Sequence, residues 1–186
     1  VGVDPASPAN APVRAGLVLY DPFGEEKKSA FRVMVRLAQA AARRGVATLR
    51  FDLSGTGESA GDQAQATWED WQAEAEAAAT WLAQRLVDKP WIAVGVRFGA
   101  LLAVPAATRA GAAGLSLVEP TLSGDACLRD LERRQLIKQA VASVNAGTQD
   151  SAARWARGEI VDFGGFEVGP GLARSLQTET LATRLG

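Results

Sequence analysis

A five-residue turn, Gly95-Val-Arg-Phe-Gly99, is the segment of this sequence that points most directly to chemistry. It follows a short apolar run and precedes small and apolar residues, so the pattern predicts a sharp turn between a strand and a helix. Turns of the form Gly-x-Ser-x-Gly hold a nucleophilic serine in a strained conformation above a sheet. Here Arg97 stands where the serine would be, and a protonated guanidinium has no hydroxyl with which to attack a carbonyl.

Two readings of Arg97 stay open if the turn is of this kind. Free N–H groups at the start of the following helix attract anions, so Arg97 and Phe98 would form a carboxylate or phosphate site. Alternatively, Arg97 forms a salt bridge with Glu25, Glu26 or Glu119 and fills the crevice. We favour the salt bridge, because half-buried arginine is usually paired within the protein. An ordinary strand-to-helix turn with two glycines is the third alternative.

A second loop lies just after the first predicted strand. In a turn of the Gly-x-Ser-x-Gly kind, a backbone N–H from this loop helps to bind an oxyanion. We therefore assign Phe23 and Gly24, together with Arg97 and Phe98, to a candidate ligand site. Glu25 and Glu26 precede adjacent lysines, which is typical of a solvated helix start rather than of acid–base catalysis.

Residues 52–62 form a third loop, Asp-Leu-Ser-Gly-Thr-Gly-Glu-Ser-Ala-Gly-Asp. Gly55-x-Gly57-x-x-Ala60 fits a dinucleotide-binding pattern, but those glycines should open a helix directly after the first strand. Here they follow the second strand, and no helix is expected before about Thr67, so we predict no nicotinamide or flavin cofactor. Ser54 and Ser59 are expected to form hydrogen bonds within the loop.

The composition removes several classes of function. The 186 residues include no histidine and one cysteine, Cys127. Within this chain that excludes Ser-His and Cys-His mechanisms, His-ligated zinc and an internal disulfide, so we predict no metal site. The net charge of −1 without a long basic run argues against nucleic-acid binding. No apolar stretch reaches about 20 residues, and the first 13 residues lack a secretion pattern, so we expect a cytoplasmic protein without a membrane span.

Short apolar strands alternate with helices through the first two-thirds of the chain. We predict strands at residues 15–20, 46–52, 91–95 and 114–119, with helices at 29–44, from 67, and at 98–109. This pattern predicts an α/β fold with a doubly wound, mainly parallel sheet in the order 2-1-3-4. Residues 21–28 and 95–99 would then meet at the switch point between the first and third strands.

The remainder of the chain reads as a small helical and hairpin region. We predict helices at 125–145 and 151–157, two short strands within 160–168, and a last helix opened by Gly169-Pro-Gly171. The whole chain is expected to be one domain, 1–186, with a core at 15–120 and a cap-like region at 121–186. The fourth strand would be an open edge, so we expect either residues 160–168 or a second copy of the chain to cover it.

These motifs together resemble the α/β-hydrolase superfamily, and within it the second type of hydrolase encoded beside exosortase A systems. The resemblance rests on the turn at Gly95–Gly99, which we call the elbow, and on the 52–62 loop. It also rests on four shorter motifs: Pro22-Phe23-x-Glu25-Glu26-x-x-Ser29, Thr67-Trp68-x-x-Trp71, Pro120-x-x-x-Gly124-x-x-x-Leu128-Arg129-x-Leu131 and, more weakly, Phe166-Glu-Val. It implies a truncated hydrolase fold and a serine-type ester or thioester hydrolase ancestry, in bacteria that export polysaccharide.

The chain departs from that family pattern at two places. Arg97 replaces the nucleophile, and nothing after Thr180 resembles the acid and histidine that follow two further strands in the superfamily. Our leading hypothesis is therefore a degenerate, non-catalytic binding or scaffold module for a small anionic or acyl-type ligand. The alternatives are an ester hydrolase with an incomplete triad and an anion-binding module centred on Arg97.

Overall fold

The computed structural model describes residues 12–141 and 150–185. Four parallel strands form its main sheet in the order β2-β1-β3-β4. They are β1 (Ala15–Tyr20), β2 (Val46–Arg50), β3 (Trp91–Val96) and β4 (Gly114–Val118). The predicted α/β class, strand positions and strand order are confirmed, and the switch point lies between β1 and β3, where Tyr20 pairs with Gly95.

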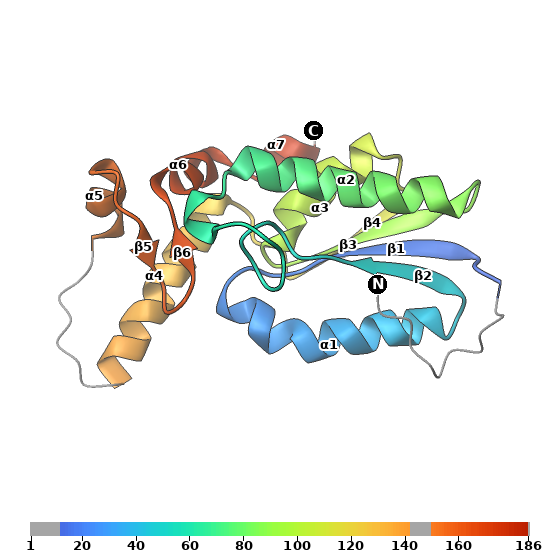
Figure 1. Cartoon of the computed structure of the whole chain (residues 1–186), viewed down its shortest axis with the longest axis horizontal. Coiled ribbons are helices and arrows are strands. Elements are labelled where there is room, and N and C mark those ends of the chain that lie inside the picture. Colours follow the sequence, from blue (N-terminus) through green and yellow to red (C-terminus); the bar gives the residue numbers. More distant parts are fainter. Residues whose placement is uncertain (1–11, 142–149, 186) are drawn as a thin grey trace.

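Helices cover both faces of this sheet (Figure 1). Helix α1 (Glu25–Ala42) lies against one face, while α2 (Trp68–Leu86) and α3 (Gly99–Arg109) lie against the other. Each face therefore buries its own apolar cluster, and the larger one, on the side of α2 and α3, contains Trp68 and Trp71. Burial on both faces explains why the central strands β1 and β3 read as short apolar runs rather than as alternating patterns.

Two helix starts follow from local side-chain chemistry. The Thr67 hydroxyl caps α2 by accepting a hydrogen bond from the Asp70 N–H at 3.1 Å. Helix α1 begins at Glu25, four residues before the predicted start at residue 29. Gly24, with φ 65°, makes the turn at the helix N-cap, and Glu25 and Glu26 occupy the first turn, where carboxylates are favoured.

The C-terminal region folds beside the carboxyl ends of the strands. It contains α4 (Gly124–Val141), α5 (Ser151–Ala156), β5 (Val161–Asp162), β6 (Glu167–Val168), α6 (Pro170–Thr178) and α7 (Ala182–Leu185). A short 3₁₀ turn (Gln63–Gln65) directly follows the 52–62 loop and contacts β6. The predicted antiparallel hairpin is present as β5 and β6. Residues 142–145, predicted as the end of α4, lie outside the described residues.

The hairpin does not cover the edge of the sheet, so the first of the two expectations for β4 is wrong. Figure 1 places the hairpin beside α4 and α5, away from β4. The reason is that Val161 and Val168 are buried in the main apolar cluster, and Trp155 donates its indole N–H to the Val168 carbonyl at 3.0 Å. Among the described residues, β4 pairs with β3 alone, and Leu115 and Val118 are 38% and 46% exposed.

None of the helices in the described part of the chain is long and apolar enough to cross a membrane.

Candidate functional site

A strained elbow joins β3 to α3. Arg97 has φ 53°, in the left-handed region that non-glycine residues rarely adopt. Both flanking glycines are required by close approach: a Cβ on Gly95 would lie 2.6 Å from the Ala100 Cα, and one on Gly99 would clash with the Tyr20 carbonyl. The segment is therefore a true elbow at the carboxyl end of β3, rather than an ordinary turn that happens to contain two glycines.

Backbone and side-chain contacts hold Arg97 in place. Its N–H donates to the Val118 carbonyl at 3.0 Å, which ties the elbow to the end of β4. Its Nε donates to both carboxylate oxygens of Glu26, at 3.0 and 3.1 Å, and its Nη1 donates to the Glu119 backbone carbonyl at 3.3 Å. Of the three partners considered from the sequence, Glu26 forms the ion pair, whereas Glu25 pairs with Lys138.

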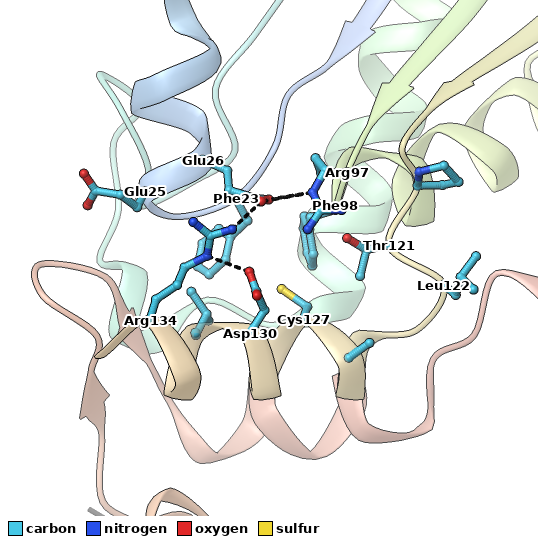
Figure 2. Close-up of a pocket in the computed structure, with 13 residues that line it drawn as sticks. Phe23, Glu25, Glu26, Arg97, Phe98, Thr121, Leu122, Cys127, Asp130 and Arg134 are labelled. Carbon is cyan, nitrogen blue, oxygen red and sulfur yellow. Dashed lines mark hydrogen bonds and ion pairs between the residues drawn. The ribbon is translucent and has the colours of Figure 1, made fainter. Parts of the chain in front are cut away.

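Glu26 is shared with a second arginine, as Figure 2 shows. Arg134 donates from Nη2 to Glu26 Oε1 at 2.8 Å and from Nε to Asp130 Oδ2 at 2.6 Å. We call Arg97, Glu26, Arg134 and Asp130 the charge network. It joins the elbow to the first turn of α1 and to α4, and its two positive and two negative side chains balance.

The electrostatics favour the charged forms of Asp130 and Arg134. Burial alone would raise the pKa of Asp130, but hydrogen bonds from Arg133 and Arg134 outweigh it, so the pKa of Asp130 is lowered. The hydrogen bond to Asp130 also raises the pKa of Arg134. All four side chains are between 21% and 37% exposed, so solvent weakens these pairs and each is worth modest stability.

A crevice of about 270 Å³ lies beside the charge network. Its apolar wall consists of Phe23, Phe98, Pro120, Leu122, Ala126 and Leu131. Aromatic packing makes this wall rigid, since the rings of Phe23 and Phe98 lie 5.4 Å apart and both rings contact Trp71. The crevice is thus apolar on one side and charged on the other, the arrangement of a small-molecule site.

The structure brings three of the four sequence-assigned residues into this crevice. Phe23, Arg97 and Phe98 line it, while Gly24 lies beside it at the N-cap of α1. Sequence reasoning missed Arg134 and Asp130. Their i, i+4 spacing was visible as a helical ion pair, but nothing in the sequence placed α4 opposite the elbow.

Cys127 also lines the crevice, but its thiol is not a nucleophile. The side chain is buried, and burial raises its pKa to about 12, with the nearby Glu26 carboxylate adding to the shift.

Iodoacetamide is therefore expected to leave Cys127 unmodified in the native protein at pH 8 and to modify it fully in 6 M guanidinium chloride. Intact mass measurement checks this, and rapid labelling of the native protein would contradict the assigned burial.

The 52–62 loop has a structural role in the described fold. Asp52 forms an ion pair with Lys27 and accepts the Glu58 N–H at 3.2 Å, and the Ser59 hydroxyl donates to the Asp52 carbonyl at 2.7 Å. The Ser59 hydroxyl is thus used within the loop, as predicted. No α-helix follows the loop glycines directly: a single 3₁₀ turn occupies Gln63–Gln65, and α2 begins at Trp68.

Two solved structures are similar to this chain. One is described with LipS and LipT, two metagenome-derived lipolytic enzymes: the identity is 31%, the match covers 59% of this chain and 43% of that chain, and the TM-score is 0.46. Another is Est1E from Butyrivibrio proteoclasticus with ferulic acid bound: 21% identity, 96% of this chain, 67% of that chain, and a TM-score of 0.63. The second likeness establishes an α/β-hydrolase-like fold.

The chain spans less than half of the first of these structures and about two-thirds of the second. No protein-family model matches the chain. No curated protein matches it either.

Proposed function

We propose that this protein is a degenerate α/β-hydrolase-like module that binds or supports a partner molecule and does not carry out serine hydrolysis. The observation that carries the proposal is Arg97 at the pivot of the elbow, ion-paired to Glu26. A guanidinium at that position replaces the attacking serine oxygen, and the chain has no histidine to serve as its base. The crevice beside Arg97, which is apolar on one side and charged on the other, supports binding of a small molecule.

A fluorophosphonate probe provides the direct test. The purified wild-type protein is expected to remain unlabelled and to hydrolyse p-nitrophenyl butyrate no faster than bovine serum albumin at equal concentration. Arg97→Ser serves as the comparison, since it restores a hydroxyl to the elbow without a histidine. Stoichiometric labelling of the wild type, or ester turnover abolished by Ser59→Ala, would overturn the proposal in favour of an ester hydrolase with an incomplete triad.

The open edge of the sheet supports a homodimer. Strand β4 carries no charge and no proline, the features that usually prevent edge strands from pairing. Antiparallel pairing of two copies about Ser116 would place Leu115 opposite Leu117 and create no like-charge contact. Light scattering is expected to give twice the 19.5 kDa chain mass. Val118 accepts from Arg97 of the elbow, so the alternate residues Leu115 and Leu117 direct their N–H groups to the open edge, and Leu115→Pro is expected to give monomers. A monomeric wild type would contradict this part of the proposal.

The motif resemblance also supports a place in the cytoplasm of bacteria with exosortase-linked polysaccharide export. The expected result is that deletion of the gene alters export of polysaccharide in its host without changing growth. Fractionation of host cells should recover the protein with cytoplasmic markers. Recovery with the periplasmic fraction would contradict the assigned compartment.

A further inference from the structure

Both arginines of the charge network converge on one carboxylate. Glu26 Oε1 accepts from Arg97 Nε at 3.0 Å and from Arg134 Nη2 at 2.8 Å, and Oε2 accepts from Arg97 Nε at 3.1 Å. Arg97 comes from the elbow and Arg134 from α4, so two separate elements present guanidinium groups to the same point (Figure 2). Planar guanidinium forks are well suited to carboxylates, and this carboxylate belongs to the protein itself.

The apolar wall of the crevice begins beside this point. Phe23, Phe98 and Leu131 line it together with the two arginines, within a volume of about 270 Å³. A cavity of about 150 Å³ is enough to hold a benzene molecule when its lining is apolar. The crevice therefore has room for a short hydrocarbon chain in addition to a charged end group.

We propose that the crevice binds a short-chain carboxylate whose head group takes the place of the Glu26 side chain between Arg97 and Arg134. This inference rests on the proposed non-catalytic function and names its ligand class. Glu26 occupies the site in the absence of ligand and competes with it. Its position in the first turn of α1, with 22% of its side chain exposed, lets it turn toward solvent when a ligand enters.

Charge balance favours a monoanion over a phosphate. Exchange of the Glu26 carboxylate for a ligand carboxylate leaves the charge that faces Arg97 and Arg134 unchanged, while Asp130 stays paired with both Arg133 and Arg134. A phosphate dianion would bring excess negative charge close to Asp130, which remains paired with Arg134. The apolar wall adds a preference for a hydrocarbon tail, since removing each methylene from water favours binding.

Removal of the competing carboxylate tests the proposal. Glu26→Gln keeps the shape of the side chain but removes the negative charge that faces Arg97 and Arg134. Arg134 keeps its ion pair with Asp130, so the positive charge of Arg97 is left uncompensated. In an NMR titration with hexanoate labelled with ¹³C at the carboxyl carbon, Glu26→Gln is expected to bind at least tenfold more tightly than the wild type. Glu25→Gln is the matched control: Glu25 also lines the crevice but pairs with Lys138 rather than with the two arginines, so this variant removes the same charge without freeing Arg97 or Arg134. It is expected to bind hexanoate much more weakly than Glu26→Gln.

Further measurements make the outcome decisive. Hexanamide, which lacks the charge, should bind equally weakly to the wild type and to Glu26→Gln. Arg97→Met in the Glu26→Gln background should abolish hexanoate binding, while cooperative thermal unfolding shows that this variant is still folded. Equal hexanoate affinity in Glu26→Gln and Glu25→Gln would overturn the inference, as would tighter binding of inorganic phosphate than of hexanoate. Turnover of p-nitrophenyl hexanoate would instead overturn the proposed function, so the two failures are distinguishable.

Discussion

Phe98→Ala is expected to lower the free energy of unfolding by about 3–5 kcal/mol, the usual effect of truncating a buried aromatic ring. Phe98 is 2% exposed, and its ring lies 5.4–6.0 Å from the rings of Phe23, Trp68 and Trp71. Removal of the ring would leave a cavity in the wall of the crevice, at the first residue after the elbow pivot. Urea denaturation followed by tryptophan fluorescence measures the change.

Phe31→Ala provides the control for this prediction. It removes the same atoms from a side chain that is 56% exposed, with the Arg50 guanidinium 5.1 Å from its ring centroid. Its effect is expected to stay below about 1 kcal/mol. Equal losses in the two variants would show that the aromatic cluster behind the elbow contributes little to stability.

Gly99→Ala is expected to destabilise the protein by roughly 2–3 kcal/mol or more, as overpacking of a tight contact does. The added methyl group would clash with the carbonyl of Tyr20 at the end of β1, and this is backbone that cannot rotate away. The elbow and β1 would have to separate, so hexanoate binding by Glu26→Gln should weaken in the same variant. Thermal and urea unfolding report the first effect, and the NMR titration reports the second.

Gly171→Ala is the matched control, because the same methyl group would meet no atom within 4 Å in α6. Its stability is expected to be unchanged or raised by up to about 1 kcal/mol, since alanine is the better helix former. If Gly99→Ala were as stable as Gly171→Ala, the close approach of the elbow to β1 would be wrong.

Local patterns predicted the sheet well because its two central strands, β1 and β3, are largely buried. The run at residues 15–20 reads as uniformly apolar for this reason, and the alternation of such runs with helices fixes a parallel sheet. The elbow could also be predicted from the sequence. Gly95 is required by its close approach to Ala100 in the same turn, and Gly99 by its close approach to the Tyr20 carbonyl at the end of β1. Apolar periodicity placed the start of α1 too late, at residue 29, whereas the interpretation of Glu25 and Glu26 as a solvated helix start is confirmed.

The partners of Arg97 depend on contacts between segments far apart in the chain. Arg97 and Glu26 are separated by 71 residues, and Glu26 and Arg134 by 108. The i, i+4 spacing of Asp130 and Arg134 permits an ion pair within α4, but it carries no information about the direction in which that helix crosses the strand ends. The hairpin shows the same limit: its two strands were predicted, but its packing beside α5 rather than over β4 was not.

The amino-acid order alone was sufficient for the strand-and-helix pattern, the strand order and the presence of a positive charge at the elbow pivot, because these follow from local periodicity and from close backbone contacts. The tertiary structure decided three other features, because each depends on where α4 crosses the carboxyl edge of the sheet. These are the ion pair between Arg97 and Glu26, the contact of Arg134 with the same carboxylate, and the shape of the crevice. Side-chain packing between distant segments sets that crossing, and no short stretch of residues encodes it.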